Sequence, residues 1–355
     1  MPEQALAPPV AGHGASQLTS VVLDAYNAEL RDKEGFIGDR ASKRAFRAIL
    51  DDWRERLRKL GDEDPLGDCP SEEIPKQRLE KLMQDEDPEV AALVHGVVEE
   101  FAQELTGVTR RFLKLKGWKD TERIAVGGGM SGSRIGHLAI GRASLLLKAD
   151  GQGVELVPIT HDPDEAALIG AAHLAPSWIF AGHDSLMAVD IGGTSIRAGL
   201  VELNLRKASN LSEAKVVGIE VWRHADDEPT REEAVERLTA MLRGMVALAE
   251  SKKRALAPFI GIGCPGIILE DGSIDRGGQN LPGNWESSRF NLPRAIAEAI
   301  PDIGGHPVTV LMHNDAVLQG LSEIPNMQDV ERWGVLTIGT GLGNARFTNR
   351  KSNSD

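Results

Sequence analysis

The sequence predicts an α/β protein with two domains. The chain has 355 residues, of which 41% are hydrophobic and 26% charged, so it can fill hydrophobic cores. This length exceeds a single ordinary core and favours two domains. From about residue 117 onward, short apolar segments alternate with segments of helical periodicity, which is typical of strands and helices layered together.

The first third of the chain is expected to be helical. Residues 1–16 are rich in Ala, Pro and Gly, without a signal-peptide pattern, and are expected to form a flexible tail. Between residues 17 and 117, apolar residues recur every three or four positions among charged residues. The segment Asp39–Leu60 is the clearest helix, because its apolar side chains share one face. These side chains are Phe46, Ile49, Leu50, Trp53 and Leu57.

A loop and a second long helix complete this region. Residues 61–75 carry Gly, Asp, Pro and Ser and are predicted to form a loop. Pro88 opens a helix whose apolar positions continue to Val108. Asp87 is the candidate N-cap, because its carboxylate can accept hydrogen bonds from free backbone N–H groups.

Strands and helices alternate in the rest of the chain. Strands are expected at residues 123–126, 154–157, 186–191, 196–203, 216–223, 259–264, 308–313 and 334–338. Helices are expected from Ser131 and at residues 164–174, 230–251, 292–300 and 316–323. The three strands between residues 186 and 223 should form a meander, and residues 175–184 should form a connector.

Charge and cysteine content exclude several classes of protein. The net charge of −13 argues against binding to nucleic acid or an anionic membrane, so a negatively charged substrate needs a local site that overrides the global field. The apolar stretch at 166–182 is interrupted and shorter than the roughly 20 residues of a membrane helix. Cys69 and Cys264 are too few for a disulfide framework or a cysteine zinc cluster. These features together favour a cytoplasmic protein.

A glycine-rich segment follows the apolar strand at 186–191. Asp190 stands near the strand end, and Gly192 and Gly193 allow a tight turn whose backbone N–H groups can face an anion. Thr194 adds a hydroxyl group. A carboxylate at this place suits a magnesium–phosphate site, where it orients the waters of the metal. Taken alone, the segment also fits an ordinary glycine hairpin.

The segment Gly339–Gly343 repeats this device after the strand at 334–338. Asn314 and Asp315 lie between the two glycine segments, at the end of the strand at 308–313 and before a helix. A carboxylate there can accept the proton of a hydroxyl group that attacks phosphorus. Taken alone, this pair also fits a plain helix N-cap.

The order of these motifs resembles the N-terminal half of the ROK family, which comprises bacterial sugar kinases and related repressors. The resemblance implies a two-lobed actin-like ATPase fold, which is ribonuclease H-like. It also implies a glucokinase-like, ATP-dependent kinase that uses Mg²⁺ and phosphorylates a hexose or N-acetylhexosamine. The matching segments are Asp190–Thr194, Gly263–Gly266, Asn280–Gly283, Asn314–Asp315 and Gly339–Gly343.

The resemblance also implies roles for individual residues. Asp315 would be the catalytic base toward the sugar hydroxyl, and Asp190 would bind Mg²⁺ through water. The phosphates of ATP would contact Asp190, Gly192, Gly193, Thr194, Gly339, Thr340, Gly341 and Gly343. The sugar would contact Gly266, Asn280, Asn314 and Asp315, and adenosine would contact Gly127, Gly128 and Gly129.

The other half of such a kinase resembles residues that come earlier in the chain. Arg123–Ser131, Val154–Pro158 and Glu165–Ala172 are similar to the family's C-terminal, adenosine-binding half. We therefore expect a circular permutation. Residues 17–174 would form a helical region plus the adenosine-binding lobe, and residues 185–355 the phosphate-binding and catalytic lobe. Termini that lie close together permit this, because the core contacts are unchanged. An artificial fusion of gene fragments would give the same order.

The chain departs from the family in two places. The family's second phosphate hairpin is normally followed by a Gly-Glu-x-Gly-His segment that binds sugar hydroxyls, and often by a cysteine-rich zinc motif. Neither pattern is present, so no zinc is expected. Gly127–Gly132 also fits G-x-G-x-x-G with Glu155 further on, so a dinucleotide site is a rival interpretation.

Three functions on this fold stay open: a sugar kinase, a non-catalytic sugar or nucleotide sensor, and an ATPase that uses water as acceptor. The expected partners are ATP and a small-molecule sugar. The amphipathic N-terminal helices could serve a homodimer or cover the protein's own core.

Overall fold

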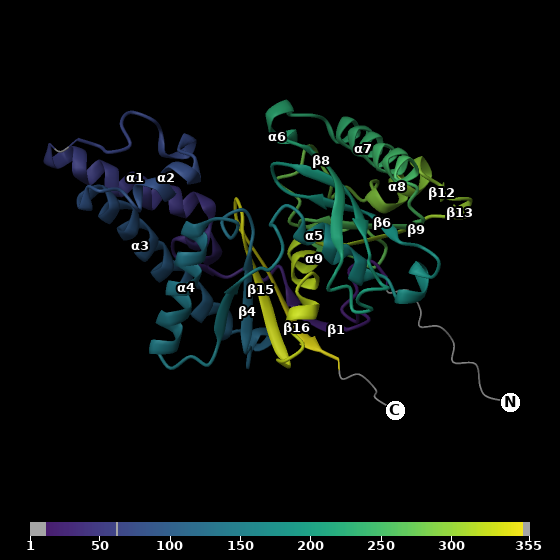
Figure 1. Ribbon diagram of the computed structural model, residues 1–355, viewed down its shortest axis with the longest axis horizontal. Coiled ribbons are helices and arrows are strands. Elements are labelled where there is room, and N and C mark those ends of the chain that lie inside the picture. Colours follow the sequence, from purple (N-terminus) through teal and green to yellow (C-terminus); the bar gives the residue numbers. More distant parts are fainter. Residues whose placement is uncertain (1–11, 62, 351–355) are drawn as a thin grey trace. The chain divides into compact units, whose positions relative to one another are not determined.

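The computed structural model describes residues 12–61 and 63–350 (Figure 1). Contacts within this part of the chain define two compact units. Unit 1 comprises residues 12–27, 164–331 and 347–350. Unit 2 comprises residues 28–61, 63–163 and 332–346.

The centre of unit 1 is a five-stranded sheet in the order β14-β9-β6-β7-β8. β6 (Ser185–Ile191), β7 (Ile196–Glu202) and β8 (Lys215–Trp222) form the expected antiparallel meander. β9 (Leu256–Cys264) pairs in parallel with β6, and β14 (Thr309–Asn314) pairs in parallel with β9. Every residue of β6 is buried, as a central strand covered on both faces requires.

Helices cover the two faces of this sheet. Alternate residues of β6, such as Met187 and Val189, pack into a core with α7 (Arg231–Ser251) and α8 (Leu292–Ala299). On the other face, α5 (Ala166–Gly170) and α9 (Asp315–Leu321) contact each other, and Leu168 of α5 contacts β7 at Gly199. Because Asp190 alternates with Met187 and Val189, its side chain lies on the face of α5 and α9.

The remaining elements of unit 1 are short. β10 pairs with β11, and β12 pairs with β13, both antiparallel. The elements are β1 (Val21–Tyr26), η4 (Ala171–Leu174), η5 (Ser177–Phe180), α6 (His224–Asp227), β10 (Ile267–Ile268), β11 (Ile274–Arg276), β12 (Asp302–Ile303), β13 (His306–Pro307) and η6 (Ile324–Asn326).

Unit 2 also has a sheet, in which β16, β15, β4 and β5 follow in that order. β15 (Arg332–Ile338) pairs in parallel with β4 (Arg123–Gly127), and β4 pairs in parallel with β5 (Glu155–Pro158). The first residues of β16 (Leu342–Asn349) complete it. The pairing with β4 explains why residues 332–346 belong to unit 2 although they stand far along the chain.

The long helices of unit 2 begin at residues whose side chains cap them. The Ser42 hydroxyl accepts a hydrogen bond from Ala45 N (3.2 Å) at the start of α1 (Lys43–Leu60). Asp87 caps α3 (Pro88–Leu113) through Glu89 N (2.9 Å), as expected. The other elements are β2 (Arg31–Asp32), β3 (Gly35–Phe36), η1 (Ile37–Ala41), η2 (Ser71–Glu73), α2 (Lys76–Leu82), η3 (Lys116–Trp118) and α4 (Arg134–Ala149).

Two expectations for the N-terminal region are wrong. Residues 17–117 are not helical throughout, because β1 stands at Val21–Tyr26, where β-branched residues and alternating burial favour a strand. Part of the expected tail at 1–16 is ordered, since His13 Nδ1 accepts a hydrogen bond from Met312 N (3.1 Å) and Gly14 N donates to Met312 O (3.0 Å). Residues 1–11 lie outside the described part of the chain.

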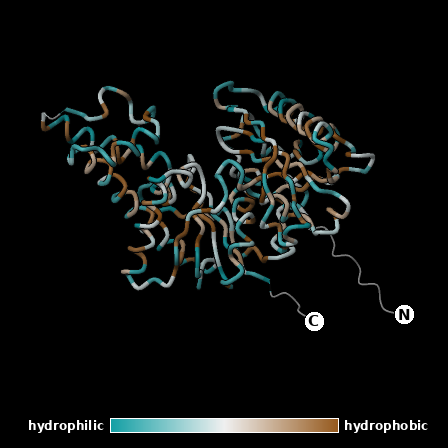
Figure 2. The backbone as a smooth tube through the Cα atoms, viewed as in Figure 1, coloured by the Kyte–Doolittle hydropathy of each residue, from teal (hydrophilic) through white to brown (hydrophobic). Residues whose placement is uncertain are grey.

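The units also divide the chain differently from the expected ranges 17–174 and 185–355. Residues 164–184 lie in unit 1, and residues 332–346 lie in unit 2. The second glycine segment, Gly339–Gly343, therefore lies in the same unit as Gly127–Gly129, the segment expected to contact adenosine, and not in the unit of Asp315. Figure 2 shows the apolar residues concentrated along the strands. Within the described residues, no helix combines the length and apolar character needed to cross a membrane.

Candidate functional site

Three parallel strands of unit 1 bring chemistry-bearing residues to one edge of the sheet. Asp190 on β6 is in register with Gly263 on β9, and Gly263 is in register with His313 on β14. Asn314 ends β14, and Asp315 begins α9. The carboxyl ends of parallel strands are where α/β proteins bind ligands. The fold therefore places Asp190 and Asp315 at a suitable position.

Asp190 is a buried carboxylate with one cationic partner. Its side chain is 6% exposed, and its Oδ2 accepts a hydrogen bond from Arg197 Nη1 (3.1 Å). Arg197 Nη2 also donates to Asp164 Oδ1 (2.7 Å). Burial raises the pKa of Asp190, and the charge of Arg197 opposes this rise. Arg197 thus reduces the cost of keeping Asp190 ionised.

Asp315 is poised to exchange a proton near neutral pH. Burial, followed by the negative charge of Asp190, raises the pKa of Asp315 to about 7. Burial also raises the pKa of the neighbouring Cys264 thiol, with Asp315 and Asp190 adding to the rise. Both carboxylates therefore lie close enough to Cys264 to affect its pKa. A carboxyl group with a pKa near the working pH is well suited to general-base catalysis.

The donor set of unit 1 fits a magnesium ion. Asp190 offers hard carboxylate oxygens, and a divalent cation held there would relieve its repulsion with Asp315. Across residues 12–61 and 63–350, no cluster of three or more His, Cys, Asp or Glu side chains could enclose a metal. Mg²⁺ usually keeps several waters and binds one or two carboxylates together with phosphate oxygens, so this sparse set suits it.

Asn314 has a structural role that the sequence left open. Its Oδ1 accepts hydrogen bonds from Ala316 N (3.0 Å) and Val317 N (3.3 Å), which caps α9. Its Nδ2 donates to Gly266 O (3.0 Å). Gly266 has φ +99°, and a Cβ there would lie 2.4 Å from Arg276 O, so only glycine fits. Asn314 therefore binds Gly266, another residue expected to contact the sugar, and fixes the start of α9, the helix that begins with Asp315.

The first glycine hairpin is held from both sides. Gly192 N donates to Ser195 O (2.9 Å), which closes the turn. The ring of His224, 3% exposed, lies with Nε2 2.9 Å from Gly192 O. Ala225 N donates to Thr194 O (3.3 Å). The backbone of residues 192–195 is therefore preorganised, as binding of an anion by backbone groups requires.

An open pocket of about 330 Å³ adjoins this hairpin within unit 1. Gly193 contacts Asn280 so closely that a Cβ at Gly193 would lie 3.1 Å from Asn280 Cβ. Of the expected site residues, Gly193 and Asn280 line the pocket, whereas Gly266, Asn314 and Asp315 are not among its lining residues. The lining residues are Gly193, His224, Ala225, Glu228, Pro229, Gln279, Asn280, Leu281, Pro282 and Gly283.

Unit 2 carries the second glycine hairpin, at Gly339–Gly343. Gly339 N donates to Gly341 O (2.9 Å), and Gly339 O accepts from Lys43 N (2.9 Å) at the start of α1. Arg44 Nε donates to Thr340 O (3.0 Å). Gly341 has open space where a Cβ would be. The first turn of α1 therefore supports the hairpin while one side of it stays accessible.

The segment Gly127–Gly129, which is expected to contact adenosine, lies against this hairpin in the same unit. Gly128 has φ +82°, and a Cβ there would lie 2.4 Å from Ile338 O, at the end of β15. Gly128 O accepts a hydrogen bond from Ser131 N (2.9 Å), and Lys76 Nζ donates to Gly129 O. Unit 2 thus assembles two of the predicted glycine segments, and unit 1 assembles the others.

The rival dinucleotide interpretation has less support in this unit. β4, α4 and β5 do form a strand–helix–strand unit around the glycine turn. Glu155, the carboxylate expected to bind ribose, forms ion pairs with Arg123 (3.1 Å) and Lys148 (3.7 Å) on the same unit. Its carboxylate is therefore used within the protein.

Several residues at these places escaped the sequence analysis. Arg197 could have been found, because pairing the hairpin around its turn sets Arg197 opposite Asp190. His224 and Lys76 contact glycine backbone that is 32 and 53 positions away in the chain, and no local pattern indicates such contacts. Lys43 and Arg44 reach a hairpin almost 300 positions away.

Comparison with known proteins identifies a family. The model of the ROK family matches residues 186–354. No curated protein matches the chain. Among solved structures, a proposed sugar kinase from Cytophaga hutchinsonii is 20% identical, with 46% of this chain and 48% of that chain covered and a TM-score of 0.35. A proposed N-acetylmannosamine kinase from Listeria monocytogenes is 23% identical, with 46% and 47% covered and a TM-score of 0.31.

The chain thus spans about half the length of these solved structures. The matched residues contain both glycine hairpins and the Asn314–Asp315 pair. The expected α/β class is confirmed by the layers of sheet and helix in the described residues. Over residues 186–354, which are 169 of the 355 residues, this chain is similar to the ROK family.

Proposed function

We propose that the protein is an ATP-dependent sugar kinase that phosphorylates a hydroxyl group of a hexose or N-acetylhexosamine. The observation that carries this proposal is Asp315, whose pKa is raised to about 7 by burial and by Asp190 at the adjoining strand end. A general base that titrates near neutral pH, next to a second carboxylate suited to Mg²⁺, is what phosphoryl transfer to a hydroxyl group uses. The match to a family of sugar kinases supports the acceptor class.

In the proposed reaction, Asp315 accepts the proton of the attacking sugar hydroxyl. The hydroxyl oxygen forms a bond to the γ-phosphorus, and the bond from that phosphorus to the β–γ bridging oxygen breaks, which releases ADP. The proton passes to Asp315 and then to solvent. Mg²⁺, held through water by Asp190, would neutralise phosphate charge when bound. Arg197 orients the Asp190 carboxylate and favours its ionised form against the effect of burial.

The other predicted residues take parts in the same proposal. Each glycine hairpin offers backbone N–H groups to phosphate oxygens of ATP: Gly192, Gly193 and Thr194 in unit 1, and Gly339, Thr340, Gly341 and Gly343 in unit 2. Gly127, Gly128 and Gly129 approach adenosine, because no side chain stands there. Asn280 contacts the sugar from the pocket beside Gly193, and Asn314 fixes Gly266 and the start of α9.

Release of ADP, measured with and without a panel of hexoses, N-acetylhexosamines and other polyols, tests the proposal. We expect release that a subset of sugars stimulates. The Asp315→Asn variant should turn over about two to four orders of magnitude more slowly, the usual range for loss of a general base. Release that no sugar changes would indicate an ATPase, and absence of release would indicate a non-catalytic sensor.

A further inference from the structure

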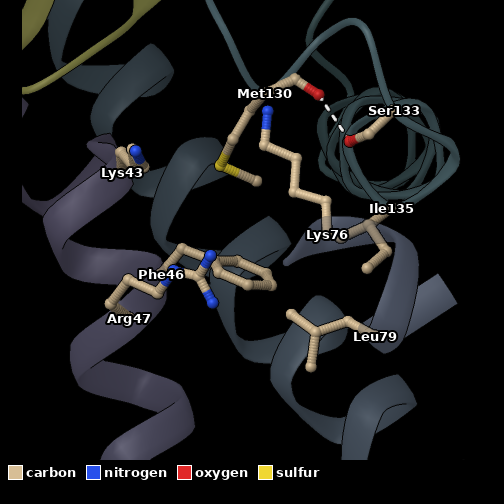
Figure 3. Close-up of a pocket in the computed structure, with 8 residues that line it drawn as sticks. All are labelled: Lys43, Phe46, Arg47, Lys76, Leu79, Met130, Ser133 and Ile135. Carbon is tan, nitrogen blue, oxygen red and sulfur yellow. Dashed lines mark hydrogen bonds between the residues drawn. The ribbon is translucent and has the colours of Figure 1, made fainter. Parts of the chain in front are cut away.

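A cluster of cations in unit 2 stands out against the net charge of −13. Lys43 and Arg47 on α1 and Lys76 on α2 line one small cavity, and Figure 3 shows them around Phe46 and Met130. No Asp or Glu is among its lining residues in the described part of the chain. Apolar side chains form the rest of the wall, together with Ser133. The lining residues are Lys43, Phe46, Arg47, Lys76, Leu79, Met130, Ser133 and Ile135.

Arg47 has an unused donor at this cavity. Its Nη2 donates to Ile74 O (2.8 Å), whereas Nη1 is buried and has no hydrogen-bond partner among the residues that the structure describes. Burial lowers the pKa of the Arg47 guanidinium, and the charges of Asp51 and Glu72 oppose this shift. A buried donor without a partner is costly, so an acceptor at Nη1 would be stabilising.

The cavity adjoins both glycine segments of unit 2. Lys76 Nζ donates to Gly129 O, and Lys43 N donates to Gly339 O (2.9 Å). The first turn of α4, capped by Ser133, supplies a further wall, and its Arg134 N already donates to Glu80 Oε1 (2.7 Å). Two lysines and an unused guanidinium donor therefore line the same space, next to the glycine turn and the hairpin.

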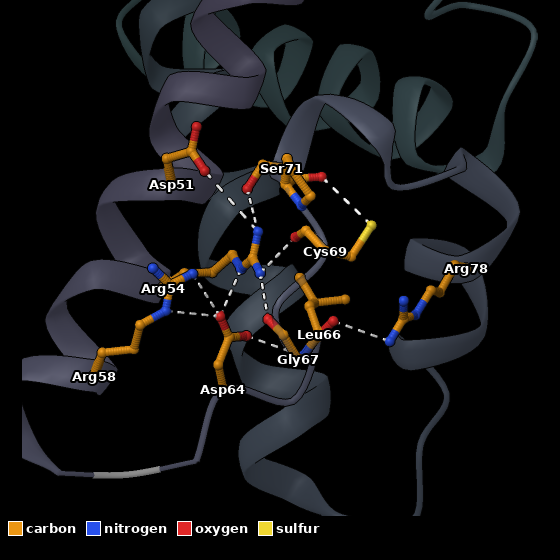
Figure 4. A network of polar contacts seen from close by, with 10 residues as sticks. Asp51, Arg54, Arg58, Asp64, Leu66, Gly67, Cys69, Ser71 and Arg78 are labelled. Atoms are coloured by element: carbon orange, nitrogen blue, oxygen red, sulfur yellow. Dashed lines mark hydrogen bonds and ion pairs between the residues drawn. The ribbon is translucent and has the colours of Figure 1, made fainter.

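A network of polar contacts around Arg54 joins α1 to the loop before α2 (Figure 4). Arg54, 1% exposed, donates to Asp64 Oδ2 (2.8 Å) and Ser71 Oγ (2.6 Å), and also to the carbonyl oxygens of Gly67 and Cys69 (both 2.8 Å). The loop before α2 is thereby tied to α1, so Arg47 and Lys76 stay close to each other. Binding groups fixed before the ligand arrives lose less entropy on binding.

We propose that Lys43, Arg47 and Lys76 form an anion subsite that binds a phosphate group of the nucleotide. The identity of the anion rests on the proposed function. The enclosed space is about 10 Å³, so the lysine side chains turn aside when a phosphate reaches Arg47 Nη1. Lys76 then exchanges a neutral carbonyl for a charged oxygen, which is the stronger acceptor. The positive charges of this subsite would attract the nucleotide locally, although the net charge of −13 repels an anion overall.

Titration calorimetry of the full chain with ADP and with adenosine, without added metal, tests the subsite. The variants are Arg47→Met and Lys76→Met, and the control is Lys59→Met, which removes an exposed charge from the same helix. We expect Arg47→Met and Lys76→Met to weaken ADP binding by about tenfold or more, the value of a charge-assisted hydrogen bond. Adenosine affinity should be unchanged, and Lys59→Met should match the wild type. Thermal unfolding confirms that each variant is folded.

Equal effects of Arg47→Met and Lys59→Met on ADP binding would overturn the subsite, as would equal losses for ADP and adenosine. If wild-type protein does not bind ADP, the proposed function fails and pyrophosphate becomes the probe. Pyrophosphate binding that Arg47→Met and Lys76→Met abolish would then support the subsite independently of the kinase. Absence of pyrophosphate binding would overturn the subsite as well.

Discussion

At the scale of single residues, the charges around Asp190 and Asp315 determine how readily each carboxyl group of the candidate site is ionised. Asp190 has Arg197 as counter-ion, whereas burial and the negative charge of Asp190 raise the pKa of Asp315 to about 7. The same burial that makes Asp315 a good base makes its ionised form costly to keep in the folded protein. Activity and stability should therefore respond to this residue in opposite directions.

The pH dependence of stability measures this cost. Because the pKa of Asp315 is higher in the folded protein than its ordinary value, the folded state holds the proton more tightly than the unfolded chain. The stability of the wild type should thus fall relative to Asp315→Asn as pH rises from about 4 to about 7. We expect the difference in Tm, variant minus wild type, to grow with pH in metal-free buffer.

Asp226→Asn is the matched control for this measurement. Asp226 is exposed and pairs with Arg223 (2.8 Å), which lowers its pKa. Its removal should therefore leave the Tm difference nearly flat, or lower it as pH rises. A Tm difference for Asp315→Asn that does not change between pH 4 and pH 8 would contradict the electrostatic account of Asp315.

Sequence reasoning reached part of this site. Asp190 could be singled out because it stands near the end of an apolar strand, before a glycine turn. Asp315 could be singled out because it follows an apolar strand and precedes a helix. Arg197 needed the hairpin register, and His224 needed a contact across a loop. The pKa of Asp315 is set by its burial and by the charge of Asp190 on a neighbouring strand, and both depend on which strands pair, which a single sequence does not display.

At the scale of elements, glycine matters where two segments approach closely. Gly128 has φ +82° and would place a Cβ 2.4 Å from Ile338 O, so the turn after β4 and the end of β15 meet only because this side chain is absent. Gly107 in α3 has open space around it instead. These two glycines therefore make a matched pair.

We expect Gly128→Ala to lower the free energy of unfolding by several kcal/mol, about 1–3 for backbone strain plus the clash. Gly107→Ala should raise it by about 0.5–1 kcal/mol, because alanine favours a helix interior. Denaturant unfolding of both variants measures the difference. Similar stabilities of the two variants would show that the contact between Gly128 and β15 is not as close as described.

The Arg54 network makes a second prediction for the helical elements. Arg54→Met leaves Ser71 Oγ and the carbonyl oxygens of Gly67 and Cys69 without their buried donor, whereas Asp64 keeps its pair with Arg58 (2.8 Å), so we expect a loss of about 1–3 kcal/mol in unfolding free energy. Arg56→Met on the same helix removes an exposed pair with Asp52 and a cation–π contact with the Trp53 ring (5.3 Å), and should cost about 0–1 kcal/mol. Equal losses in denaturant unfolding would refute a structural role for Arg54.

The elements themselves were largely predictable in unit 1. The strands expected at 186–191, 196–203 and 216–223 are observed as β6, β7 and β8, with ends displaced by no more than one residue. Each is bounded by glycine or polar turns, which mark strand ends in sequence. β1 was missed because Val21–Leu23 is a short apolar run inside a segment with helical spacing, and its strand character comes from pairing.

At the scale of the whole molecule, the chain order is the unusual feature. Residues 28–61, 63–163 and 332–346 form one unit, because β15 pairs with β4 across about two hundred positions. Local patterns carry no information on such a pairing, so the boundaries expected from the sequence lie elsewhere. We propose that this order reflects a circular permutation of the family's arrangement.

The described ends of the chain support a permutation. Arg350 N donates to Ser20 O (3.0 Å), and Arg350 Nη1 donates to Leu18 O (2.9 Å), so the two ends lie together in unit 1. A variant that joins Asp355 to Met1 and opens the chain after Gly182 should keep the fold, because the core contacts do not change. Circular dichroism and thermal unfolding measure this. An unfolded product, or a Tm lower by more than about 15 °C, would argue against the permutation.

The central claim is transfer of a phosphoryl group from ATP to a sugar, with Asp315 as the base. Incubation with γ-labelled ATP and the panel of hexoses and N-acetylhexosamines, followed by separation of the sugars, measures this transfer directly. We predict label on at least one sugar with the wild type, and about two to four orders of magnitude slower labelling with Asp315→Asn. Label that appears only as free phosphate, or equal labelling by both proteins, would contradict the account.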